Sequence, residues 1–151
     1  MWGTYLATLC GSLVGLIVYG AAHPTSAIYA STRLVFRPGC HQLVERSFAW
    51  GDAPFAVCHR CFGVYAGLAL GGLIAALGFR ADPGHRKIWI AATAPMLVHV
   101  VALNIVPSID LWWLRVATGA LFGTWGAWAL SLALGQAFEH PIPRLKLRSR
   151  T

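Results

Sequence analysis

The hydrophobic residues of the chain fall into long runs that are separated by short polar segments. Because about 20 consecutive apolar residues suffice to span a bilayer, this pattern predicts an all-α integral membrane protein with four transmembrane helices. The predicted helices lie within residues 1–22, 62–79, 88–106 and 110–135. We expect residues 1–137 to form a single transmembrane domain, with a loop at 23–61 between its first two helices and a basic tail at 138–151.

The composition agrees with a membrane location. Of the 151 residues, 57% are hydrophobic and 11% are charged, whereas a soluble domain carries about 25% charged residues. The formal net charge of +7 raises the question of nucleic acid. The basic residues stand at the ends of the apolar runs, as topology signals do, and they do not form a polar face with interleaved aromatic residues. We therefore expect no nucleic-acid partner.

The distribution of positive charge predicts the orientation in the membrane. With four spans, the loop after the second helix lies on the same side as the tail, and together these segments carry seven Lys and Arg residues against four on the opposite side. The positive-inside rule then places both termini in the cytoplasm, and we expect a prokaryotic cytoplasmic membrane. The loop at 23–61 would be extracytoplasmic.

This loop contains a Cys/His-rich stretch that runs from Cys40 to Cys61. The stretch holds three of the four cysteines and two of the six histidines of the chain. Its centre, residues 50–54, has the Gly, Asp and Pro content of a turn, and residues 44–50 fit a short helix before that turn. Cys10 lies in the middle of the first apolar run and is interpreted as a small buried hydrophobic residue.

The cysteines of this stretch have the spacing of a metal site. Cys58 and Cys61 form a Cys-x-x-Cys pair, and Cys40 supplies a third thiolate. Structural zinc commonly takes four ligands, often three Cys and one His. The candidates for the fourth ligand are His41, His59, His99 and, as an oxygen donor, Glu45. Since exposed cysteine pairs oxidise outside the cytosol, a redox-active Cys58–Cys61 pair and an inert disulfide stay open as alternatives.

Arginines accompany the thiols. Arg46 and Arg60 would lower the pKa of neighbouring thiols and are suited to binding an anion such as a phosphate or a quinone oxygen. Taken singly, each is also explained by an interfacial arginine that reaches the lipid head groups. The candidate catalytic residues are Glu45, Arg46, Arg60 and Arg115, and whether the protein is an enzyme is left open.

Two ionisable residues lie inside the predicted membrane helices. His99 and Arg115 both fall roughly 7–10 Å below the outer surface, on the side of the Cys/His-rich stretch. Ionisable groups in lipid are costly and usually functional. The structural alternatives are a neutral His99 bonded to a backbone carbonyl and a pairing of Arg115 with Asp110. We include Arg115 with Arg46 and Arg60 among the expected cofactor-binding residues, and His99 among the candidate metal ligands.

Glycines recur every four residues in two of the helices. Gly63, Gly67 and Gly71 line one face of the second helix, and Gly119 and Gly123 repeat the spacing in the fourth. Small residues at this spacing let helices approach closely in lipid. They predict tight packing, and they are candidate faces for a homo- or hetero-oligomer.

Three motifs of the loop and second helix carry a resemblance to a known family: Cys40-His41-Gln42, Glu45-Arg46-Ser47-Phe48 and Cys58-x-Arg60-Cys61-x-Gly63-x-Tyr65-x-Gly67. They resemble the signature of a widespread family of small polytopic membrane proteins of unknown function. Pro95-Met96 and Arg115-x-x-Thr118-Gly119-x-x-x-Gly123 are similar to its later motifs. The resemblance implies an integral membrane protein whose site is the Cys/His/Arg cluster, and it implies no activity.

Two positions depart from that family pattern. Phe62 replaces a small hydroxyl residue, and His99 replaces an acidic residue. A weaker likeness is to the quinone-coupled disulfide oxidases similar to DsbB, which have four spans and an outward Cys-x-x-Cys pair at the start of the second. Those proteins carry a second reactive pair, for which this chain has only Cys40.

The sequence therefore favours an outward-facing Cys/His metal site, with zinc as the expected ion, beside an arginine-lined pocket for a lipid, a quinone or a small anion. The alternatives are a membrane thiol-disulfide oxidoreductase that uses Cys58 and Cys61, and a structural subunit of a membrane complex. The lipid bilayer is the expected surrounding in each case.

Overall fold

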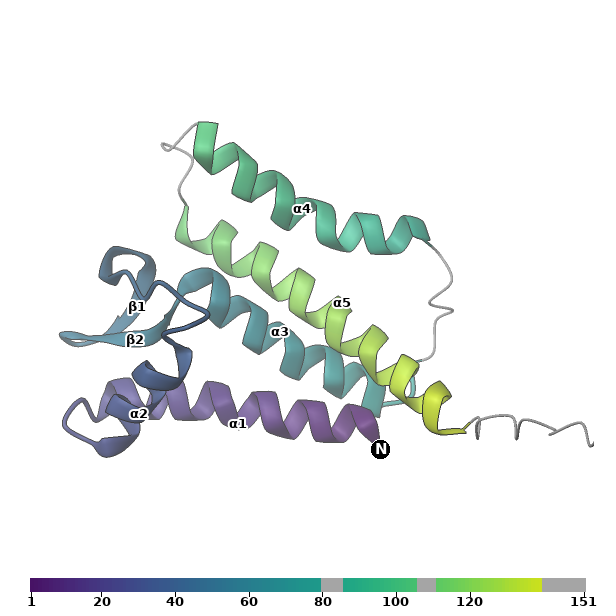
Figure 1. The fold of residues 1–151 in the computed structure, drawn as a ribbon, viewed down its shortest axis with the longest axis horizontal. Coiled ribbons are helices and arrows are strands. Elements are labelled where there is room, and N and C mark those ends of the chain that lie inside the picture. Colours follow the sequence, from purple (N-terminus) through teal and green to yellow (C-terminus); the bar gives the residue numbers. More distant parts are fainter. Residues whose placement is uncertain (80–85, 106–110, 140–151) are drawn as a thin grey trace, which may run out of the picture.

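The computed structural model describes residues 1–79, 86–105 and 111–139. Within these residues, α1 (Trp2–Ala22), α3 (His59–Ala76), α4 (Arg86–Ile105) and α5 (Trp112–Glu139) are long helices, and α2 (Ala27–Phe36) is short. The long helices lie side by side in the order α1, α3, α5, α4 (Figure 1). A β-hairpin and α2 cover one end of this layer, and the N-terminus lies at the other end.

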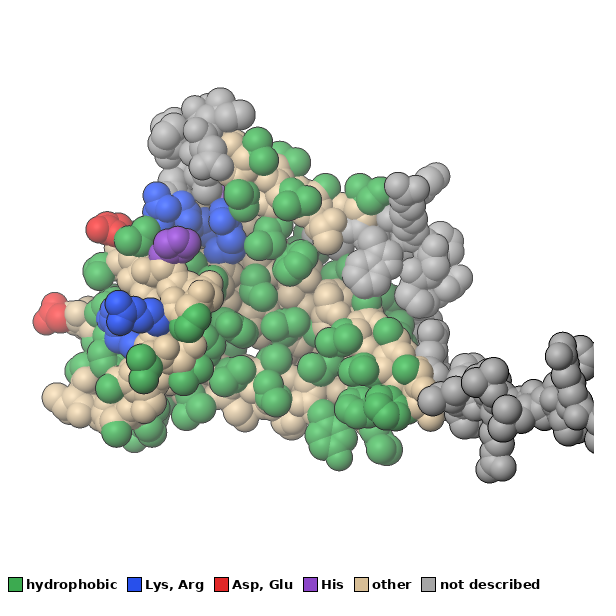
Figure 2. Space-filling model, in the orientation of Figure 1, with side chains coloured by type: hydrophobic (Ala, Val, Ile, Leu, Met, Phe, Trp, Pro, Cys, Tyr) green, Lys and Arg blue, Asp and Glu red, His purple; other side chains and the backbone are tan. Residues whose placement is uncertain are grey.

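The described residues confirm the mostly helical fold, and several of the helices have the length and composition of membrane spans. Among the described residues, three helices are long and apolar enough to cross a bilayer: Trp2–Ala22, His59–Ala76 and Trp112–Gly135. α4 supplies a shorter apolar stretch, Thr93–Ala102, so the fourth span stays a prediction. Figure 2 shows hydrophobic side chains along the helices, while the Lys and Arg side chains on that face gather near the hairpin. Exposed apolar side chains suit a lipid surrounding, because the hydrocarbon of the bilayer is itself apolar, and a helix there satisfies its own backbone hydrogen bonds.

The glycine stripes join α3 to α5. A Cβ atom on Gly63, Gly67 or Gly71 would lie less than 3.0 Å from the backbone of α5. Gly119 and Gly123 of α5 approach the backbone of α3 just as closely. The close approach expected from the spacing is therefore made within one chain, and assembly with other chains through such faces stays a prediction.

The loop contains a hairpin where the sequence suggested a helix. Only Val44–Arg46 form a 3-10 turn (η1), after which β1 (Ser47–Trp50) pairs antiparallel with β2 (Ala53–Cys58). The expectation of a helix over 44–50 is therefore wrong, while the turn expected at 50–54 is confirmed. Gly51, with φ of +60°, and Asp52 form a two-residue connection, and a Gly-Asp pair between two apolar segments is a hairpin signal.

A hydrophobic cluster fastens this loop to the helices. It is built from buried residues of α1, α2 and β2, together with the first cysteine of the stretch: Ile17, Ala21, Phe36, Cys40, Phe55, Ala56 and Val57. The Tyr29 hydroxyl of α2 also donates a hydrogen bond to the Pro54 carbonyl, at 3.0 Å. The loop is thus folded over the end of α1 and α3 and does not form a separate finger.

Several predicted features fall outside the described residues. They are residues 80–85 of the polar loop expected at 80–87, Asp110 as the partner of Arg115, and the basic tail from residue 140 onward. The last two residues of that expected loop belong to α4, which begins at Arg86. The predicted boundary of the tail at residue 138 falls in the last turn of α5, which ends at Glu139.

Candidate functional site

Three cysteine sulfurs meet at the end of the helices that carries the hairpin. The Sγ atoms of Cys40, Cys58 and Cys61 all lie within 4.8 Å of one another. In a tetrahedral site with Zn–S bonds of about 2.3 Å, the sulfurs are about 3.8 Å apart. The three thiols therefore need to close by about 1 Å at most to hold one ion, which small side-chain rotations can supply. All three are free thiols.

Local structure explains how two of the sulfurs meet. Cys58 is the last residue of β2 and the N-cap of α3, and Cys61 lies in the first turn of that helix. Residues three apart on a helix share one face, so the Cys-x-x-Cys spacing brings the two thiols together. No side chain caps the start of α3, and this end of the helix therefore favours negative charge.

The third sulfur is held by the segment that follows α2. The Cys40 amide donates to the Phe36 carbonyl at 2.9 Å, and the Cys58 amide donates to Cys40 Sγ at 3.2 Å. Gln42 has a positive φ of 52°, and its side-chain amide donates to the Arg33 carbonyl at 2.7 Å. These contacts turn the chain back so that Cys40 faces the start of α3. The sequence did not reveal this role of Gln42. Glycine is the residue type that signals a left-handed backbone conformation, and no sequence pattern marks a glutamine that adopts it.

The thiols interact electrostatically. The Cys61 thiol donates a hydrogen bond to the Cys58 sulfur and lowers the pKa of Cys58 to about 5, although partial burial acts in the opposite direction. The Cys40 side chain and the backbone amides of Cys61 and Arg60 also lower this pKa. The cluster thus favours a thiolate at Cys58, which is the form that binds metal ions and attacks disulfides.

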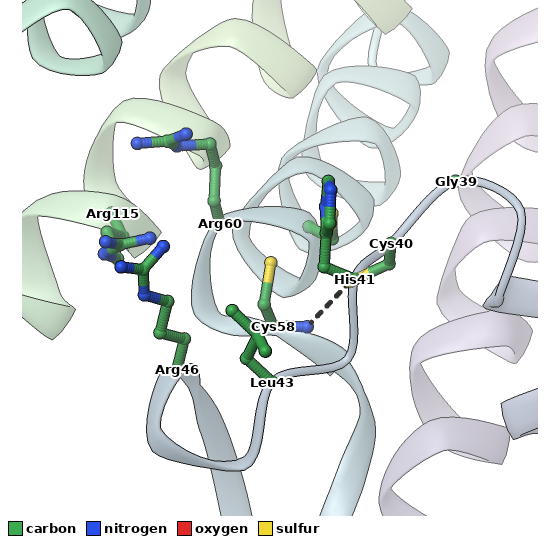
Figure 3. A pocket seen from close by; sticks show the side chains of 9 residues that line it. Gly39, Cys40, His41, Leu43, Arg46, Cys58, Arg60 and Arg115 are labelled. Atoms are coloured by element: carbon green, nitrogen blue, oxygen red, sulfur yellow. Dashed lines mark hydrogen bonds between the residues drawn. The ribbon is translucent and has the colours of Figure 1, made fainter. Parts of the chain in front are cut away.

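The thiols border a pocket of about 300 Å³. Three arginines from different elements line it: Arg46 of η1, Arg60 of α3 and Arg115 of α5. Figure 3 shows the side chains of Arg46 and Arg115 reaching the same side of the pocket, with Arg60 above them and the Cys58 sulfur pointing into the same space. Arg115 is only 6% exposed, so its charge is held inside the protein.

The other candidate residues lie in different places. His41 lines the pocket, while the His99 Nδ1 atom lies 3.5 Å from Arg60 Nη2. The buried His59 ring packs edge-on against Phe48, at 4.5 Å between centroids. Glu45 is exposed and is not among the described residues that line the pocket. The left-handed Gln42 and the extended Leu43 separate His41 from the 3-10 turn that contains Glu45, so no helical turn brings these two side chains together. Among the described residues, the group of clustered ligand atoms contains the three thiols alone.

Comparison with known protein families shows to which family this chain belongs. A family model described as "Predicted membrane protein (DUF2085)" matches residues 40–129, which is more than half of the chain. The chain belongs to this family. The match begins at Cys40 and includes every thiol and arginine of the pocket, and it supports the family resemblance while leaving the individual signature motifs untested.

A curated relative shares a shorter segment. "Uncharacterized protein MJ1492" of Methanocaldococcus jannaschii is 49% identical over 35 residues, which make up 23% of this chain and 22% of the relative. The chain thus covers about a fifth of the length of that relative. No solved structure is significantly similar to the chain.

Proposed function

We propose that Cys40, Cys58 and Cys61 bind a soft divalent metal ion, with zinc as the expected metal, in an extracytoplasmic site of this membrane protein. The observation that carries the proposal is the mutual approach of the three sulfurs to within 4.8 Å. Thiolates select zinc and other soft metals over magnesium or calcium. Cys40 is distant in sequence from the other two cysteines, so the fold and not local spacing brings its sulfur to them.

The ion would join three separate parts of the fold. Its ligands come from the segment after α2, from the end of β2 and from the first turn of α3. Because metal binding stabilises the folded state over the unfolded chain, the ion would fix the loop onto the helices. It would also hold the loop against the arginine-lined pocket, for which a lipid, a quinone or a small anion is the proposed occupant.

Metal analysis of the protein, purified in detergent under reducing conditions, tests the proposal. We expect a stoichiometric metal ion and three thiols that become reactive only after chelation. Cys40→Ser should weaken metal binding by roughly 100-fold, since a structural site of four ligands provides about 10–16 kcal/mol in total. Cys10→Ser is the matched control, because Cys10 lies in α1 and outside the cluster. Metal content that is equal in both variants would overturn the proposal.

A specific observation favours a second function. The lowered pKa of Cys58, next to Cys61 at the start of a helix, suits a membrane thiol-disulfide oxidoreductase. In that reaction the Cys58 thiolate attacks a substrate disulfide, and Cys61 then releases the substrate as two thiols while Cys58 and Cys61 form a disulfide. Purified protein that lacks metal and contains one reducible Cys58–Cys61 bond would establish this function instead.

The same proposal includes an orientation, with both termini in the cytoplasm of a prokaryotic cell and the hairpin outside. It is supported by the excess of Lys and Arg in the segments around 80–87 and 138–151. A C-terminal fusion to a reporter that is active only in the cytoplasm should be active. Activity of a periplasmic reporter at the same position would reverse the orientation.

A further inference from the structure

We propose that α2 lies in the interfacial layer of the membrane, with its exposed apolar face in contact with lipid, and that it thereby holds the segment that carries Cys40. The partner of this surface is the lipid bilayer. The inference does not depend on the metal ion proposed above, because it rests on the exposed face of α2, on the place of this helix beside α1, and on the hydrogen bonds that follow it.

The exposed residues of α2 form one continuous face. At 3.6 residues per turn they occupy an arc of about 160°, and they are Ala27, Ile28, Ala30, Ser31, Leu34 and Val35. None of them is charged, and Leu34 and Val35 are 69% and 67% exposed. The remaining residues of the helix are buried or half-buried. A surface helix of a soluble domain turns its apolar side towards the core and its polar side outward, so the arrangement in α2 is the reverse of that pattern.

The opposite face of α2 is fixed to the protein. Thr32 and Phe36 are buried, and Phe36 belongs to the hydrophobic cluster that joins the loop to the helices. The Tyr29 hydroxyl donates to the Pro54 carbonyl of β2 at 3.0 Å and accepts from Arg33 Nη1 at 3.0 Å. These contacts hold the inner face in place, so the apolar face stays on the outside of the molecule.

The position of α2 along α1 places this face at the boundary of the membrane. Figure 1 shows α2 beside the end of α1 that is far from the N-terminus. A Cβ atom on Gly20 of α1 would lie 3.3 Å from the Tyr29 Cα atom, so the two helices pack together at this residue. α1 is long and apolar enough to span a bilayer and ends at Ala22, only about 3 Å further along its axis. Amphipathic helices at this level insert their apolar side about 5–10 Å into the lipid.

Lipid suits this face better than a second protein chain. α2 has ten residues and is about 15 Å long, and its exposed face contributes six residues. A stable protein interface takes about 20–30 residues from each partner, which is far more than this helix offers. The C-cap residue Arg37 is exposed, and a guanidinium group at the end of the helix suits the phosphates of lipid head groups.

The last turn of α2 is bonded to the segment that carries the first cysteine. The Phe36 carbonyl accepts from the Gly39 and Cys40 amides, at 3.2 and 2.9 Å. The Arg33 carbonyl accepts from the side-chain amide of Gln42 at 2.7 Å. A helix that is fixed in the membrane interface therefore also fixes the position of Cys40, whose side chain lies buried beside the start of α3.

Photo-cross-linking in nanodiscs of phosphatidylcholine and phosphatidylglycerol tests the contact with lipid. A benzophenone-bearing amino acid replaces Leu34 in the full-length chain, and its adducts are identified by mass spectrometry. Leu9, exposed in the middle of α1, is the lipid-facing control position, and Asp52, exposed in the hairpin turn, is the water-facing one. We expect lipid adducts at Leu34 in a yield close to that at Leu9, and none at Asp52. A yield at Leu34 as low as that at Asp52, or a cross-link from Leu34 to a second copy of the chain, would overturn the proposal.

A charged substitution tests the link between α2 and Cys40. Leu34→Asp puts a carboxylate on the lipid-facing side, and Ala49→Asp, at an exposed position of β1, is the matched control. In chelator-treated, reduced protein in the same nanodiscs, Cys40 should react with a maleimide several-fold faster in Leu34→Asp than in Ala49→Asp. Leu34→Ala keeps the position apolar and should react at close to the native rate. Equal rates in the two aspartate variants, or an equal acceleration by alanine, would overturn this link.

Discussion

Replacing Gly119 by alanine should separate α3 from α5 without removing any side chain of the site. The new carbon would lie less than 3.0 Å from the Arg60 carbonyl oxygen, and 3.1 Å from the Val64 amide nitrogen. Ordinary van der Waals contact begins at 3.4 Å, so the two backbones must move apart by at least about 0.4 Å. Overpacking of this kind typically costs about 1–3 kcal/mol.

Gly126→Ala provides the matched control in the same helix. A Cβ atom there would have nothing within 4 Å. Both variants gain the same helix propensity, about 0.5–1 kcal/mol, so the difference in unfolding free energy between them isolates the packing cost. We expect Gly119→Ala to be less stable than Gly126→Ala by about 1–3 kcal/mol.

The assay is reversible unfolding in mixed micelles with an increasing fraction of sodium dodecyl sulfate, followed by the helical circular dichroism signal. Equal unfolding free energies for the two variants would refute the close packing of α3 against α5. Because Arg115 lies one turn before Gly119 on α5, the separation should also move this arginine away from the thiols.

Two further predictions concern the loop. In metal-free, reduced protein, alkylation of Cys58 by iodoacetamide should stay fast at neutral pH and slow as the pH falls through about 5. The reason is that the fold lowers the pKa of the Cys58 thiol from 9.0 to about 5. An alkylation rate that falls with a midpoint near pH 9 would contradict this prediction. The same shift means that the Cys58 thiolate adds stability as the pH rises from about 5 towards 9. Gln42→Ala should lower the unfolding free energy by about 1–2 kcal/mol, because the hydrogen bond to the Arg33 carbonyl is lost while the positive φ remains. Gln42→Gly should cost less because glycine tolerates this φ, and a larger loss in the glycine variant would argue against the left-handed conformation.

The sequence alone predicted the membrane helices closely. The apolar runs expected at 1–22, 62–79 and 110–135 correspond to α1, α3 and α5. Such agreement is expected, because a segment in lipid must satisfy its backbone hydrogen bonds internally, and length and hydrophobicity then suffice to specify a helix. The approach of Cys58 and Cys61 was equally predictable, since it follows from the spacing of two residues in one helical turn.

The sequence was less informative about the loop. The sequence was interpreted as a short helix at 44–50 followed by a turn at 50–54, although the Gly51–Asp52 pair carries a hairpin signal. Short segments of this kind are ambiguous because tertiary packing decides between helix and strand. Here Phe55 and Val57 of β2 are buried in the cluster with α1 and α2, which stabilises the strand.

Only the tertiary structure decided which distant residues meet. Cys40 reaches the Cys-x-x-Cys pair because α2, the left-handed Gln42 and the hairpin fold the loop back. Arg115 reaches the same pocket because the glycines let α5 approach α3 closely. The chain's hydrophobic pattern thus determined where helices form, since that depends on each segment and its solvent. The constellation of three thiols and three arginines depends on packing between segments, and no local pattern encodes it.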